Sequence, residues 1–190
     1  SDMANVKEHL ELIKEFVPLS ANQLWVSDIT YIDTAVGFVY LNLITDAYSR
    51  KIVGWAIGNT LEAKYTVEAL QMALKQVPKR TEGLIHHSDR GVQYCCNDYV
   101  KLLNKNNVKI SMTENGDPRE NAIAERVNGI LKTEWLNQMK LVSLEQAMCE
   151  LKRIISIYNC NRPHASLDMK TPESAHKLTG VLKRRWKTYY

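Results

Sequence analysis

Two aspartates in this 190-residue chain occupy positions where an ionised carboxylate needs an explanation. Asp28 lies in the middle of LWVSDITYI, residues 24–32, whose β-branched and aromatic side chains favour a buried strand. Asp89 lies in the turn that follows a second short apolar run, residues 84–87. Burying an ionised carboxylate costs free energy unless it is paired or binds a metal ion. Both aspartates are therefore candidates for metal binding or catalysis.

Each aspartate also has an ordinary structural interpretation. Asp28 could lie on the polar side of a half-buried strand, and Asp89 could be a turn former before Arg90 and Gly91. Other acidic residues in turns or at helix caps are interpreted as structural: Asp33, Asp46, Asp98, Glu114 and Glu120.

A third carboxylate, Glu125, lies within DPRENAIAERVNGILK, residues 117–132, which predicts a helix. Asp117 can cap this helix, Pro118 suits its first position, and Glu120 stands where a capping box has its carboxylate. At about 100° per residue, the helix carries a polar stripe and an opposite apolar side. The stripe consists of Asn121, Glu125, Asn128 and Lys132, and the apolar side of Ile123, Val127, Ile130 and Leu131. A solvated face is the alternative interpretation of this stripe.

Strand and helix patterns follow one another in an order that indicates an α/β fold. Strands are predicted for residues 24–32, 38–44, 52–57, 84–87 and 108–112. Helices are predicted for residues 4–17, 61–77, 97–104 and 143–159, besides the one from residue 117. The first three strands should form an antiparallel meander, and the later ones alternate with helices. We expect a mixed five-stranded sheet flanked by helices.

Composition limits the class of protein. The length suits one domain with a core, and no apolar run is long enough for a membrane span. The net charge is +4, but five basic residues and no acidic ones fall between Lys177 and Tyr190, so the rest of the chain is nearly neutral. The four cysteines lack CxxC spacing, which argues against a zinc knuckle or disulfide framework. We expect a cytoplasmic protein without membrane contact.

Three blocks of this sequence resemble, in order, the catalytic blocks of insertion-sequence transposases and retroviral-type integrases. They are WVSDITY (25–31), HSDRGVQY (87–94) and NAIAERVNGILKTE (121–134). Thirty-five residues separate Asp89 from Glu125, the spacing after which the Asp, Asp-35-Glu class is named. Downstream, YNCNRPHASLDMKTP (158–172) resembles a further pattern of the bacterial members.

The resemblance implies a ribonuclease-H-like fold in which Asp28, Asp89 and Glu125 bind two Mg²⁺ or Mn²⁺ ions. Hard carboxylate oxygens suit these ions, which activate the attacking oxygen and stabilise the leaving one in phosphodiester chemistry. With the helical spacing near the start and the basic tail, we expect a leader helix in residues 1–20, a catalytic core over 21–160 and a C-terminal extension with a basic tail over 161–190. The expected activity is metal-dependent DNA cleavage and strand transfer during transposition.

The partners implied are DNA, both element ends and target, and further copies of the chain in an active oligomer. No zinc-binding block or helix-turn-helix precedes Asp28, so end recognition is expected from a separate domain or protein. A bacterial, nucleoid-associated protein is implied. The alternatives are a metal-dependent nuclease of the same fold and a catalytically silent DNA-binding or assembly module.

Further residues are candidates for contacting DNA. They comprise the polar stripe and the tail cations: Asn121, Asn128, Lys132, Lys183, Arg184, Arg185 and Lys187. For His86 and His87, core or surface roles are favoured over a place near the scissile phosphate. The Arg162-Pro163-His164 motif has no mechanism from sequence, and packing is favoured. Glu134 lies on the apolar side of its helix and needs a partner cation.

Overall fold

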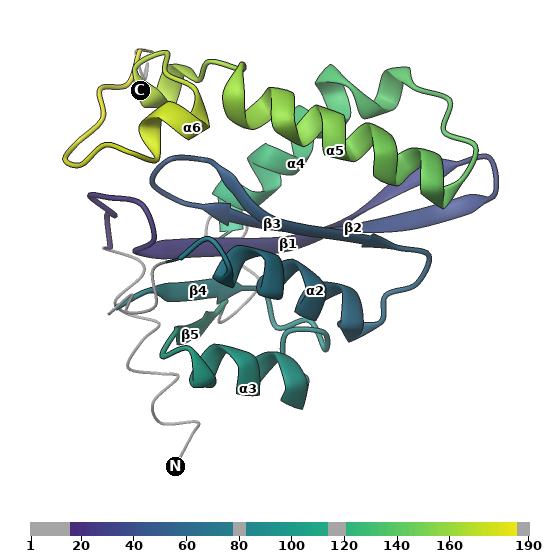
Figure 1. Ribbon diagram of the computed structural model, residues 1–190, viewed down its shortest axis with the longest axis horizontal. Coiled ribbons are helices and arrows are strands. Elements are labelled where there is room, and N and C mark those ends of the chain that lie inside the picture. The colour runs from purple at the N-terminus through teal and green to yellow at the C-terminus, as the bar shows by residue number, and fades with distance from the viewer. Residues whose placement is uncertain (1–15, 78–82, 114–120, 186–190) are drawn as a thin grey trace.

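The structure is a computed structural model that describes residues 16–77, 83–113 and 121–185. Its centre is one mixed sheet of five strands in the order β3-β2-β1-β4-β5 (Figure 1). The strands are β1 (Leu24–Thr34), β2 (Gly37–Asp46), β3 (Ile52–Gly58), β4 (Ile85–Ser88) and β5 (Lys109–Met112). The first three pair antiparallel, while β4 runs parallel to β1 and β5 parallel to β4. The predicted meander and mixed five-stranded sheet are confirmed.

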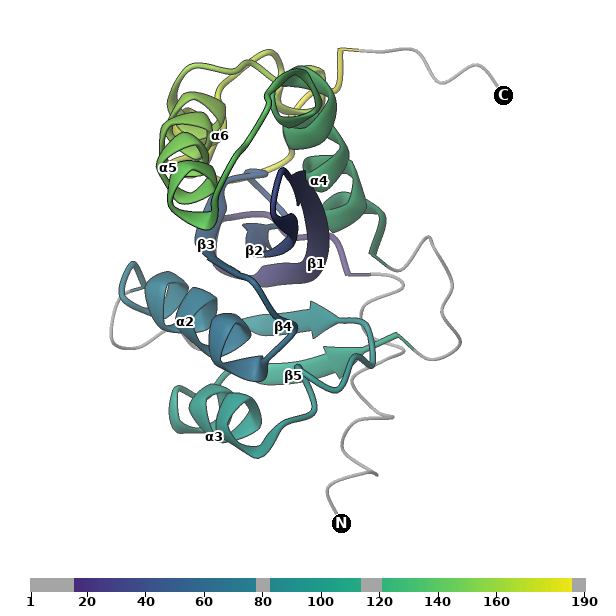
Figure 2. The same cartoon turned by 90° about the vertical axis from the view of Figure 1, so that its right-hand side faces the viewer.

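Helices cover both faces of this sheet. They are α2 (Ala63–Leu74), α3 (Asn97–Lys105), α4 (Ala122–Glu134), α5 (Leu144–Cys160) and the short α6 (Pro172–Ala175). Figure 2 shows α4 and α5 on one side of the sheet and α2 and α3 on the other. The α2, α3 and α5 predictions are confirmed to within three residues at each end. The predicted start of the fourth helix, residues 117–120, lies outside the described residues. So does most of the leader helix predicted for residues 4–17, and its two described residues, 16 and 17, are not helical.

Strand alternation divides most of the apolar side chains between two larger cores, beside a smaller cluster around Val26 and Ala124. On β2, Val39, Leu41 and Leu43 face α4 and α5, whereas Ile44 faces α2 and α3. The first core is completed by Val127, Leu131, Leu151, Ile154 and Tyr158, and the second by Trp25, Leu70, Tyr99 and Leu103. Because these side chains are nearly all inaccessible to solvent, α4 is held firmly against β1 and β2.

The segment after α5 packs back onto the core. Lys51 forms an ion pair with Glu173 at 2.6 Å, and the Tyr48 hydroxyl donates to the Gly180 carbonyl at 2.9 Å. Thr179 also forms an isolated β-bridge with Ser20. In the described ranges, no helix combines the length and the apolar character that crossing a bilayer requires.

Candidate active site

The register of β1 and β4 brings Asp28 and Asp89 to the same end of neighbouring parallel strands. Val26 pairs with His87 at the last position of this ladder, and each aspartate lies two residues further along the chain. Parallel neighbours keep equivalent residues side by side, so the two carboxylates end up close together. Both line one pocket of about 320 Å³.

Asp28 is also held by a side chain of α4. Asn128 is 5% exposed, and its Nδ2 donates a hydrogen bond to Asp28 Oδ2 at 2.6 Å. Burial is the main reason that the pKa of Asp28 is raised to about 6. The negative charges of Asp89 and Glu125 raise this pKa too, while hydrogen bonds from Asn128 and the Ile29 backbone lower it. The third acid is therefore close enough to act on Asp28 electrostatically.

The other two acids are exposed at the edge of this arrangement. Glu125 lies in the first turn of α4, and Asp89 Oδ1 accepts a hydrogen bond from the Gly91 backbone at 2.9 Å. Among the residues described, no three acidic, histidine or cysteine side chains stand close enough to hold a metal ion together. The side chains of Asp89 and Glu125 would therefore have to turn toward Asp28 to share an ion with it.

The chemistry of this donor set fits a hard divalent cation. Within the described part of the chain, Asp28 forms no ion pair with lysine, arginine or histidine, although it is half-buried and has two other carboxylates nearby. Carboxylate oxygens are the preferred ligands of Mg²⁺ and Mn²⁺. A cation placed among these acids would relieve their mutual repulsion and lower the pKa of Asp28.

The polar stripe of α4 faces β1 rather than solvent. Asn121 is 7% exposed and its Nδ2 donates to the Ser27 carbonyl at 3.1 Å. The Lys132 ammonium lies 4.2 Å from the centre of the Tyr31 ring, a cation–π contact. Together with the burial of Asn128, the Asn121 contact rules out the solvated-face interpretation for the two amides of the stripe. The two amides are therefore engaged with β1, and Lys132 remains partly exposed beside it.

The tail cations have separate surroundings. Arg185 forms an ion pair with Asp168, and Lys183 is exposed. Arg184 lines a pocket on another side of α4. Lys187 lies outside the described residues.

The two histidines before Asp89 are buried in the interior of the protein. His86 Nε2 lies 2.6 Å from Ser27 Oγ and 2.7 Å from the Tyr99 hydroxyl, and burial lowers the pKa of His86 to about 3. His87 Nδ1 lies 2.8 Å from Ser111 Oγ on the neighbouring strand β5. Both rings are almost completely buried, which agrees with the core role among the predicted alternatives.

The downstream motif ties the end of α5 to α4. Arg162 forms an ion pair with Glu134, and its hydrogen bonds are the main reason that the pKa of Glu134 is lowered. The His164 ring meets Tyr158 edge-on, with 5.1 Å between ring centres. Arg162 is thus the partner cation that Glu134 needs, and the packing interpretation of this motif is supported.

Tyr94 belongs to the pocket of the acids although sequence reasoning did not single it out. It lines the pocket with Asp28 and Asp89 and is 3% exposed. Its pKa is raised well above the usual value, mainly by burial and further by Tyr99 and the two aspartates. Its position five residues after Asp89 in HSDRGVQY was the available signal.

Comparison with known proteins shows a family match over most of the chain. The integrase core domain family matches the chain over residues 18–118, which is more than half of its length, and again over residues 106–172.

Insertion-element proteins are similar to most of the chain. The uncharacterized 31 kDa protein of insertion element IS600 from Shigella sonnei is 38% identical over 162 residues, covering 85% of this chain and 59% of that protein. The transposase InsF for insertion sequence IS3A from Escherichia coli K12 is 36% identical over 169 residues, covering 88% and 58%. This chain therefore spans less than two thirds of the length of these curated relatives.

Solved structures share the fold at low sequence identity. The catalytic core of HTLV-2 integrase, in complex with magnesium, superposes with a TM-score of 0.65 at 18% identity, over 84% of this chain and 99% of that one. The simian T-cell lymphotropic virus intasome gives a TM-score of 0.72 at 17% identity, over 92% and 62%. These likenesses show the ribonuclease-H-like fold. Family match, sequence relatives and fold agree, and the chain belongs to the integrase core domain family of insertion-sequence transposases and integrases.

Proposed function

We propose that this chain is the catalytic core of a bacterial insertion-sequence transposase that cleaves DNA strands and joins them by phosphoryl transfer, using divalent metal. The observation that carries the proposal is the meeting of Asp28 and Asp89 in one pocket, with the charge of Glu125 acting on the same carboxylate. The relatives support it, because InsF is a transposase.

We assign the three acids to metal binding. Asp28, Asp89 and Glu125 would hold two Mg²⁺ or Mn²⁺ ions, which when bound supply Lewis-acid stabilisation of the phosphoryl oxygens. The HTLV-2 core, whose fold this chain shares, was solved with magnesium. Asn128 would then be a positioning residue, because its hydrogen bond fixes the Asp28 carboxylate. Tyr94 closes one side of the pocket with an apolar ring.

The partners follow from the same proposal. DNA is the substrate, as element end and as target, and joining two ends calls for more than one copy of the core. The HTLV-2 integrase core has been solved in trimeric and dimeric forms. Since the matched relatives are longer than this chain, recognition of the ends is assigned to a segment or protein beyond these 190 residues.

A product analysis tests the proposed function against a simple nuclease. A labelled duplex with a free 3′-hydroxyl is incubated with the chain and Mg²⁺ or Mn²⁺, together with unlabelled target DNA. Strand transfer gives labelled products longer than the substrate, whereas a nuclease gives shorter ones only. Longer products that require metal support the proposal, and metal-dependent shortening alone contradicts its strand-transfer part.

A further inference from the structure

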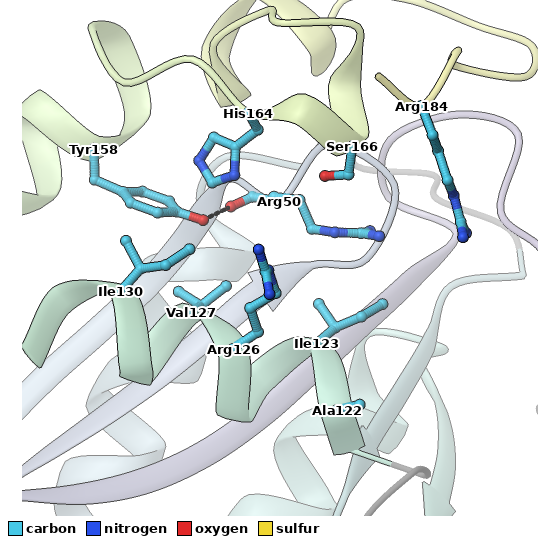
Figure 3. Close-up of a pocket in the computed structure, with 10 residues that line it drawn as sticks. All are labelled: Arg50, Ala122, Ile123, Arg126, Val127, Ile130, Tyr158, His164, Ser166 and Arg184. Carbon is cyan, nitrogen blue, oxygen red and sulfur yellow. Dashed lines mark hydrogen bonds between the residues drawn. The ribbon is translucent and has the colours of Figure 1, made fainter. Parts of the chain in front are cut away.

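A second pocket, of about 530 Å³, gathers three arginines on the other side of α4 (Figure 3). Arg50 comes from the turn between β2 and β3, Arg126 from α4, and Arg184 from the segment after α6. In helical phase Arg126 lies on the side of α4 opposite to Asn121 and Asn128, which face β1. The pocket is therefore separate from the pocket of Asp28 and Asp89, with α4 between them.

The charges in this arginine pocket are all of one sign. Its lining contains no aspartate or glutamate. In the described ranges, the guanidinium groups of Arg50 and Arg126 take part in no hydrogen bond or ion pair. Burial lowers the pKa of Arg50, and the like charges of Arg184 and Arg126 lower it further. Arg50 is half-buried, and a cation partly removed from water beside like charges costs free energy unless an anion joins it.

A buried histidine gives an independent sign of a missing ligand. His164 lines the same pocket, is 6% exposed, and its Nε2 has no hydrogen-bond partner within the described part of the chain. Figure 3 shows its ring between Tyr158 and Ser166, above Arg50. Buried polar atoms are nearly always hydrogen-bonded, so an unpaired one at the wall of a cationic pocket indicates an absent acceptor or donor.

We propose that the arginine pocket binds a phosphate group, and that a DNA backbone phosphate supplies it. Guanidinium groups recognise phosphate oxygens by paired hydrogen bonds. Ser166 and His164 add neutral hydrogen-bonding groups, while the apolar side chains of Ile123 and Val127 keep the local dielectric low and so strengthen the charge interactions.

The position of the arginine pocket is compatible with binding a DNA strand that also reaches Asp28, Asp89 and Glu125. Arg126 follows Glu125 directly on α4, and a helix with its side chains is roughly 10 Å across. A phosphate held by the arginines would thus fix DNA about one helix width from the acids. Only this choice of DNA as the phosphate source rests on the proposed function.

Inorganic phosphate tests the site without any DNA. The variants are R126Q and the double variant R126Q/R184Q, because both side chains are exposed and their loss should leave the fold intact. R153Q is the matched control, since Arg153 is an exposed arginine of α5 that forms an ion pair with Glu150. Arg50 is kept, because its backbone adopts a left-handed conformation with φ of 62°.

The readout is the imidazole resonance of His164 during a phosphate titration at constant ionic strength. Phosphate should shift this resonance in the wild type and in R153Q, and the shift should be lost in R126Q/R184Q. The pKa of His164, held down to about 4 mainly by burial and then by Arg162 and Arg50, should rise when phosphate binds. Equal responses in R126Q/R184Q and R153Q would overturn the phosphate site.

Duplex DNA tests the source of the phosphate. Binding is measured against salt in EDTA, so that no strand chemistry takes part. Losing one phosphate contact should reduce the slope of log affinity against log salt by about 0.9 in R126Q/R184Q, with no change in R153Q. If the wild type binds inorganic phosphate but R126Q/R184Q shows the same salt slope as the wild type, the assignment of the phosphate to DNA is overturned. A reduced slope in a protein that shows no strand transfer would uphold the site and refute the proposed function instead.

Discussion

Asn128 Nδ2 lies 2.6 Å from Asp28 Oδ2, so one hydrogen bond joins α4 to the middle of β1 across 100 residues of sequence. Asn128 is almost fully buried, and its amide reaches one of the three acids assigned to metal binding. The bond therefore links the packing of the helix to the orientation of a metal ligand.

We predict that N128A weakens the use of metal while the chain still folds. Loss of a partner that orients a ligand typically lowers metal affinity 10- to 100-fold, and the lost bond to a charged group costs about 1.5–3 kcal/mol of stability. The measurement is strand-transfer rate against Mg²⁺ concentration. N104A, an exposed asparagine on α3, is the control. The same Mg²⁺ requirement in N128A and N104A would refute the positioning role.

Metal should stabilise the fold through the three acids. Bound Mg²⁺ or Mn²⁺ favours the native state by mass action, so the melting temperature of the wild type should rise with metal concentration. D28N, D89N and E125Q should each show a smaller rise, because each removes one charge from the site. D33N, which alters an exposed aspartate of β1, should respond like the wild type. Equal rises in all five proteins would contradict metal binding by these acids.

The buried His86 should make stability depend on pH. Its pKa in the fold is about 3, below the usual value of about 6.5, so the unfolded chain takes up the proton first. Its contribution is complete above about pH 6.5 and is lost as the pH falls toward 3. H86Q should flatten the curve of unfolding free energy against pH in this range. The control is Y99F, which removes only the hydroxyl partner of His86 and should lower stability without changing the slope of stability against pH. If H86Q also keeps this slope, His86 is not the source of the pH dependence.

The ion pair of Glu134 and Arg162 should contribute to stability and not to chemistry. Because both side chains are partly exposed, a double-mutant cycle with E134Q and R162Q should give a coupling of about 0.2–1 kcal/mol. Strand-transfer rates of the single variants should stay within about twofold of the wild type. A large loss of rate in R162Q at unchanged stability would instead assign Arg162 to substrate binding.

Sequence was informative where the signal is local or follows a pattern of spacing. The strands around Asp28 and before Asp89 have strong apolar character, and α5 begins at Leu144, one residue after the predicted start, with the Ser143 side chain as its cap. Helical phase also placed Asn121 and Asn128 on one stripe. It could not say what faces that stripe, because the contact with β1 depends on how the helix docks.

Contacts between distant segments were beyond the sequence for the same reason. No local pattern around Glu134 indicates that its partner is Arg162, which lies 28 residues away in the sequence. The arginine pocket draws Arg50, Arg126 and Arg184 from three separate elements. In the sequence Arg184 is a candidate DNA contact in the tail, whereas Arg50 and Arg126 look like ordinary surface cations. Only the three-dimensional fold shows that these charges converge.

The most direct test of the central claim is metal-dependent strand transfer by D89N beside D33N. Both variants lose one carboxylate, but Asp89 shares the pocket of Asp28 whereas Asp33 is exposed further along β1. We predict that D89N forms no strand-transfer product in Mg²⁺ or Mn²⁺ while its melting curve stays cooperative, and that D33N keeps the wild-type rate. Strand transfer by D89N at the rate of D33N would contradict the assignment of this site to catalysis.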